Sequence, residues 1–127
     1  KKDQKVKKQQ QVFAAKEGLE RAGNDKELFS KILKKFLSEY NDSNILFNHF
    51  TEEDKFDEAQ QYASELKGVL AKIGAYRFSY LLSLIEKAFA VNNRAYIEKY
   101  MAIYEVELTR TQDAIENFLV YLEQNTH

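Results

Sequence analysis

Residues 56–73 read FDEAQQYASELKGVLAKI, and their apolar residues recur at alternating intervals of three and four. An α-helix completes one turn in about 3.6 residues, so these side chains form a single stripe along a helix. Gly74 follows the stripe directly, and glycine commonly ends helices. We expect Thr51 to begin the helix, because the acids at 52–54 would suit its first turn. The stripe consists of Phe56, Ala59, Ala63, Leu66, Leu70 and Ile73.

Two further apolar stripes follow on the C-terminal side of this helix. Both have helical spacing, and the second alternates between intervals of four and three over about seven turns. They predict one helix that closes at Asn92-Asn93 and a longer helix after it. The first stripe consists of Phe78, Leu81, Leu82, Ile85 and Phe89, and the second of Ile97, Met101, Tyr104, Leu108, Thr111, Ile115, Phe118 and Leu122.

The N-terminal side carries one long stripe and one short helical segment. Asn24 is the expected N-cap of the long helix, with Glu27 three residues later as in a capping box. This helix either continues past Asn41–Asn44 towards Phe50 or kinks there. A short helix over residues 13–22 precedes it and ends at Gly23. The long stripe consists of Phe29, Ile32, Leu33, Phe36, Leu37 and Tyr40.

These helices predict an all-α fold in one domain. The chain has 127 residues, no proline and four glycines, so little interrupts its helices. Short connections between long amphipathic helices favour an antiparallel up-and-down four-helix bundle with a short additional N-terminal helix. We expect the bundle to cover residues 12–127, with most Phe and Tyr side chains in its core. Residues 1–11 form a basic, glutamine-rich leader, which we expect to be disordered and to link the domain to an upstream kinase or receiver.

The composition excludes several classes of function. The chain has 19 basic and 20 acidic side chains, whereas a dedicated nucleic-acid binder normally has a strong basic excess. Cysteine is absent, which excludes disulfides, iron–sulfur clusters and thiol catalysis. His49 and His127 are the only histidines, too few for a multi-histidine metal site. No apolar run reaches the roughly 20 residues that span a bilayer, and the start shows no signal peptide. We therefore expect a cytoplasmic protein without membrane insertion.

The helix over residues 56–73 also has a second face, which is small and polar. It comprises Gln60, Ser64, Lys67, Gly68 and Ala71, and we call it the polar α-face. A glycine inside a helix costs about 1 kcal/mol relative to alanine. On physical grounds alone, tight packing of another helix against Gly68 is the favoured compensation, and close approach of a partner protein is the alternative.

Residues 63–75 read ASELKGVLAKIGA and resemble the signature helix of histidine-containing phosphotransfer (HPt) domains. That signature is approximately Ala-His-x-Leu-Lys-Gly, followed by Gly-Ala. Residues 17–29 resemble the entry to the family's second helix, and residues 56–59 the start of its phosphorylation-site helix. The resemblance covers residues 12–122. It implies a four-helix bundle that relays phosphoryl groups between receiver aspartates, in which Lys67 neutralises the phosphoryl group and Gly68 permits close docking.

Ser64 occupies the position of the phospho-accepting histidine. A neutral imidazole attacks near pH 7 without first losing a proton, whereas a serine hydroxyl needs an adjacent base. Glu65 points to a different face of the helix and does not serve as that base. His49 lies outside the polar α-face, and His127 ends the chain. The resemblance therefore implies a pseudo-HPt domain without phosphotransfer.

The expected function is binding of a response-regulator receiver domain, or of a hybrid histidine kinase, through the polar α-face. We expect no enzymatic activity, cofactor or metal, and we attribute the acids at 52–58 to helix-dipole complementarity. One alternative is a helical interaction or dimerisation domain, and whether the chain is a monomer or a homodimer is left open. A further alternative is phosphotransfer through Ser64 itself. The apolar residues suited to a dimer face are Tyr80, Leu84, Tyr100 and Ile103.

Overall fold

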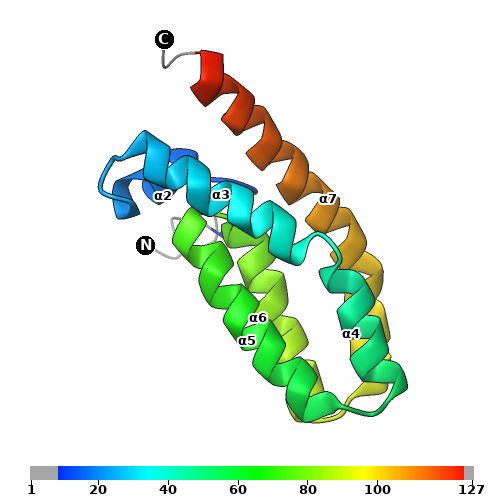
Figure 1. Ribbon diagram of the computed structural model, residues 1–127. Helices are drawn as coiled ribbons and strands as arrows, with labels where there is room; N and C mark the ends of the chain where they lie inside the picture. The colour runs from blue at the N-terminus through cyan, green and yellow to red at the C-terminus, as the bar shows by residue number, and fades with distance from the viewer. Residues whose placement is uncertain (1–8, 125–127) are drawn as a thin grey trace.

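The computed structural model describes residues 9–124, which contain α-helices and no β-strand (Figure 1). The all-α prediction is therefore confirmed. Each of the predicted apolar stripes lies on a helix, and the connections between helices are short. The helices are α2 (Ala15–Arg21), α3 (Lys26–Tyr40), α4 (Ser43–Glu52), α5 (Phe56–Ile73), α6 (Tyr76–Ala90) and α7 (Arg94–Gln124).

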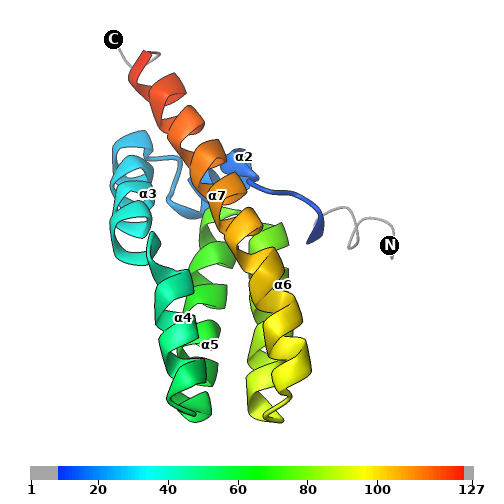
Figure 2. The same cartoon turned by 90° about the vertical axis from the view of Figure 1, so that its right-hand side faces the viewer.

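The helices α4, α5, α6 and α7 lie side by side and reverse direction from one to the next (Figures 1 and 2). The most extensive packing joins α5 to α6, which are connected only by Gly74 and Ala75. In addition, α6 packs on α7, while α4 contacts both α5 and α7. The C-terminal part of α7 extends beyond the other three, where α3 packs against it (Figure 2). The short helix α2 packs against α5 and α3.

The core between these helices is rich in aromatic side chains. Phe47 of α4 is fully buried and packs edge-on against Tyr104 of α7, with ring centroids 5.3 Å apart. The Tyr104 hydroxyl donates a hydrogen bond of 2.7 Å to Ser43 Oγ at the start of α4. Burial raises the pKa of Tyr104, so the phenol stays protonated. Its hydroxyl can therefore continue to donate the hydrogen bond that links α7 to α4. All five Ala, Leu and Ile side chains of the α5 stripe are buried, as the spacing predicts.

Two predicted helix starts are wrong. Asn24 has a left-handed backbone (φ 61°), whereas an N-cap residue is usually extended; Asp25 caps α3 instead and accepts a hydrogen bond from the backbone N–H of Leu28 at 3.0 Å. Thr51 lies in the last turn of α4, where its hydroxyl donates to the carbonyl of Phe47. Helix α5 begins later, at Phe56. The side chains of Asn24 and Thr51 suit a cap, but the backbone path places them elsewhere.

The region around Asn41 and Asp42 separates α3 from α4, so the long N-terminal helix does not run on to Phe50. The short N-terminal helix begins at Ala15 rather than at Phe13. Phe13 instead packs against Phe118, with ring centroids 5.6 Å apart. Residues 1–8 of the predicted leader lie outside the described residues. Gln11, which the prediction placed in the leader, accepts a hydrogen bond of 2.9 Å from the backbone N–H of Arg77.

The backbone of α2 packs directly on the turn between α5 and α6. The N–H of Ala14 donates to the carbonyl of Gly74 at 2.8 Å, and Gly74 has the left-handed backbone (φ 95°) that ends α5. A Cβ atom on Gly18 would lie 2.3 Å from the carbonyl oxygen of Ile73. Gly18 is therefore the glycine at which two helices approach each other most closely.

Candidate functional site

The five residues of the polar α-face all lie on α5, spaced along one side of the helix. Ser64 and Gly68 are exposed, whereas Gln60, Lys67 and Ala71 are half-buried. The face is thus accessible to solvent at Ser64 and Gly68 and partly covered at its other three residues.

An open groove of about 610 Å³ lies beside this face, between α2, α5 and α6. Lys67, Gly68 and Ala71 line the groove, so the structure brings these three predicted residues together. Gln60 and Ser64 do not line it; they lie towards the N-terminus of α5. The other residues that line the groove are Gln9, Arg21, Lys72, Tyr76, Ser79, Tyr80 and Ser83.

Gly68 does not serve internal packing. Among the described residues, and apart from its own stretch of helix, no heavy atom lies within 4 Å of a Cβ atom built on Gly68. The favoured expectation from the sequence, a tightly packed neighbouring helix, is therefore wrong at this position. Such a close approach occurs at Gly18 instead. Because Gly68 has no side chain, the backbone of α5 is uncovered at the edge of the groove. The glycine destabilises the helix by about 1 kcal/mol relative to alanine.

Replacing Gly68 by alanine should stabilise the folded domain. The new methyl group enters open space, while alanine favours the helix by about 0.8–1 kcal/mol over glycine. For a domain of this size we expect the melting temperature to rise by about 3–5 °C. Thermal unfolding followed by circular dichroism measures the change. A lower melting temperature would show that Gly68 has a structural role in the fold.

Lys67 is engaged by α6. Its Nζ donates to Glu86 Oε1 at 2.6 Å, and the two side chains are 37% and 22% exposed. The carbonyl of Lys67 also accepts a hydrogen bond of 3.0 Å from Ser79 Oγ. The cation of the polar α-face therefore has a carboxylate partner within the fold.

Arg21 closes the opposite side of the groove. Its guanidinium donates to the carbonyl of Ala71 at 2.9 Å and also to the hydroxyl of Tyr76. The carbonyl of Ala71, at the C-terminal end of α5, thereby gains a second donor beside the backbone N–H of Gly74, which lies 3.3 Å from it. Sequence reasoning missed both Arg21 and Glu86. The tight Gly74-Ala75 turn was a usable signal for Glu86, because a turn of two residues places α6 antiparallel to α5 and directly beside it.

Ser64 has no base within hydrogen-bonding distance in the part of the chain that the structure describes. Within residues 9–124, its hydroxyl has no hydrogen-bond partner. The charge of Glu65 acts on the other side of α5: burial raises the pKa of Tyr62 to about 12, and Tyr40 and the charge of Glu65 add to this effect. Glu65 therefore lies towards α3, as expected from its place on the helix.

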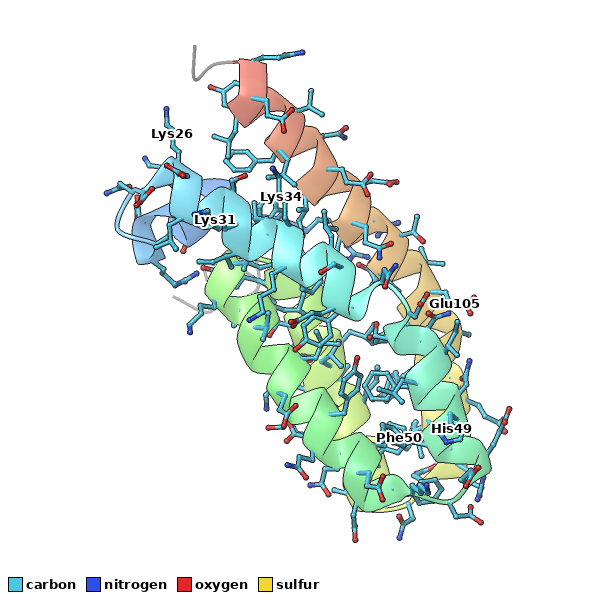
Figure 3. The ribbon with its side chains drawn as sticks, viewed as in Figure 1. Lys26, Lys31, Lys34, His49, Phe50 and Glu105 are labelled. Atoms are coloured by element: carbon cyan, nitrogen blue, oxygen red, sulfur yellow. The ribbon has the colours of Figure 1, made fainter. Side chains whose placement is uncertain are left out.

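The histidines do not take over the role of an acceptor in the polar α-face. His49 lies on α4, where Figure 3 labels it, and its Nε2 is 3.8 Å from Glu53 Oε1. Its side chain is about half exposed. Phe50, the next residue, contacts Tyr62 of α5. His127 lies outside the described residues.

A second groove, of about 330 Å³, runs along α6 and α7. Three of the four residues predicted for a dimer face line it, namely Tyr80, Leu84 and Ile103. Tyr100 does not; it stacks on Tyr96 with ring centroids 6.0 Å apart. The structure therefore brings most of this apolar set together.

The acidic residues before and within the first turn of α5 do not form a metal site. Among residues 9–124, no group of three or more His, Asp or Glu side chains is arranged to hold a metal ion. Asp54 instead pairs with Arg94 at the start of α7. None of the helices within the described residues is both long enough and apolar enough to cross a membrane.

Comparisons with protein-family models, with curated proteins and with solved structures find no match for this chain.

Proposed function

We propose that this chain is a pseudo-HPt domain that binds the receiver domain of a response regulator, or of a hybrid histidine kinase, without accepting phosphate. In this proposal α4, α5, α6 and α7, with α3 extending the bundle, form an antiparallel four-helix bundle of the HPt type. The polar α-face is the docking surface. The domain acts in the cytoplasm as an adaptor, competitor or regulator and is not an enzyme.

The observation that carries the proposal is the bare surface at Gly68. The glycine weakens α5, and no helix within the described residues makes use of the space that it leaves. A partner that approaches the backbone of α5 closely does make use of it. Ser64, which is exposed one turn before Gly68, adds a small side chain to the same surface. The Lys-Gly pair of the motif that the HPt resemblance singles out falls on this surface, and its later Gly-Ala falls on the turn that follows α5.

The absence of phosphotransfer follows from the chemistry of Ser64. Its hydroxyl has no base within hydrogen-bonding distance among the described residues. A serine phosphate ester, once formed, also does not readily return its phosphoryl group to an aspartate. Activity through Ser64 would be revealed by a stable phosphate adduct in intact-mass spectra after exposure to a phosphorylated receiver.

An NMR titration with a panel of receiver domains tests the proposal. Each receiver is added with and without beryllium trifluoride, which mimics an aspartyl phosphate. We expect shifts centred on the amides of Ser64, Lys67, Gly68 and Ala71 with at least one receiver. If every receiver fails to shift these amides, the proposed function is wrong.

Substitution Ser64→His should restore phosphoryl acceptance. The position is exposed, so the imidazole is accessible to a receiver and the fold has room for it. Its neutral nitrogen attacks without a base near pH 7. The measurement is acid-labile incorporation of ³²P from a phosphorylated receiver, with Asn48→His on α4 as a control for exposed histidines. A folded Ser64→His protein that incorporates no label would show that the docking surface does not place this residue at the receiver's aspartate.

A helical dimerisation domain is the second candidate function. The observation in its favour is the groove that Tyr80, Leu84 and Ile103 share. Tyr80 and Ile103 are 46% and 42% exposed, which is high for large apolar side chains. Size-exclusion chromatography with light scattering separates the candidates: a stable dimer without receiver binding would favour this function over the pseudo-HPt proposal.

A further inference from the structure

The cation that the HPt resemblance assigns to the phosphoryl group is already compensated within this fold. Lys67 Nζ donates to Glu86 Oε1 at 2.6 Å, a distance typical of a strong charge-assisted hydrogen bond. Glu86 lies on α6 and is only 22% exposed, so the packing of α5 on α6 holds its carboxylate near Lys67. The lysine side chain is thereby drawn towards α6.

Among the described residues, the other charged side chains around the groove do not pair with Lys67. Arg21 is held by the carbonyls of α5 and by Tyr76 on the far side of the groove. Glu65 acts on Tyr40 and Tyr62, on the side of α5 that faces α3. Lys72 lines the groove near the C-terminal end of α5, two turns beyond Ser64. Lys67 and Glu86 are therefore the ion pair that joins α5 to α6 beside the polar α-face.

We infer that Glu86 serves as an internal counter-charge for Lys67, so that the docking surface binds a receiver domain equally well whether or not its aspartate is phosphorylated. This inference rests on the proposed function and specifies its regulation. A phosphoryl group that approaches Lys67 also meets the carboxylate of Glu86, and the attraction and the repulsion offset each other. Recognition then depends on the shape of the surface around Gly68 and not on the charge of the receiver's active site. Glu86 is in this sense a specificity-determining residue that acts through Lys67.

The test compares receiver affinities with and without beryllium trifluoride. For the wild-type domain we expect the two dissociation constants to agree within about twofold. For Glu86→Gln, Lys67 has lost its counter-charge, and we expect the beryllofluoride form to bind about fivefold more tightly, as for one solvent-exposed ion pair. The double variant Lys67→Gln/Glu86→Gln should return the ratio to about one. Glu116→Gln, on the exposed face of α7, removes the same charge elsewhere and should leave the ratio unchanged.

A second arm uses inorganic phosphate in place of a receiver. Wild-type amide shifts of Ser64 and Gly68 should not respond to millimolar phosphate, while those of Glu86→Gln should. Thermal unfolding confirms that each variant is folded. A wild-type domain that already prefers the beryllofluoride form fivefold, or a Glu86→Gln variant that responds to neither probe, would overturn the inference. If no receiver binds at all, the proposed function fails, but the phosphate arm still decides whether Glu86 compensates Lys67.

Discussion

A protein with Gly68→Arg should fold normally and lose receiver binding by about 100-fold or more, which corresponds to about 2.7 kcal/mol. The Cβ of the arginine enters open space at the edge of the groove, so the substitution displaces no atom where the side chain joins the helix. Arginine also favours the helix over glycine by about 0.8 kcal/mol. The same side chain covers the bare surface of α5 and prevents a partner from reaching the backbone. The free energy of unfolding therefore rises slightly, while the docking surface no longer binds the receiver.

Isothermal titration with the receiver found by NMR measures the loss of affinity, and thermal unfolding measures stability. Asn48→Arg is the matched control, because Asn48 is exposed on α4 and the substitution adds the same positive charge. We expect the control to bind as the wild type does. Unaltered binding by Gly68→Arg would refute the docking surface, and a falling melting temperature would refute the conclusion that Gly68 makes no internal contact.

Gly18→Ala should have the opposite effect on stability. The added Cβ would lie 2.3 Å from the carbonyl oxygen of Ile73 and 2.7 Å from the Phe29 ring. Atoms cannot approach this closely, so α2 must move away from the turn between α5 and α6. Overpacking of this kind typically costs about 1–3 kcal/mol, which exceeds the gain of about 1 kcal/mol from placing alanine in a helix. The displacement also carries Arg21 away from the carbonyl of Ala71.

Urea unfolding of Gly18→Ala beside Gly68→Ala makes the comparison, because the two variants introduce the same methyl group into two helices. We expect the free energy of unfolding to fall for Gly18→Ala and to rise for Gly68→Ala. Amide hydrogen exchange should speed up in α2 for Gly18→Ala alone. Equal effects of the two substitutions would mean that α2 is not packed on the α5–α6 turn in solution.

Apolar spacing alone predicts which segments are helical and which side of each helix is buried. Apolar spacing is a local property, since residues three and four apart share a face whatever lies opposite. The stripe from Ala59 to Ile73 and the end of α5 at Gly74 were predictable for this reason. The starts of the helices were harder to predict. Asn24 and Thr51 have side chains suited to an N-cap, but neither residue lies at the N-cap of a helix.

The contacts of each residue of the polar α-face depend on how the helices pack together. Gly18 and Gly68 are both glycines within helices, yet one lies against the carbonyl of Ile73 and the other faces open space. The pairing of Lys67 with Glu86 likewise depends on how α6 lies against α5. Contacts between helices depend on the crossing angle and axial offset of whole elements, which the packing of many side chains sets together. The periodicity of a single helix contains no information about that arrangement.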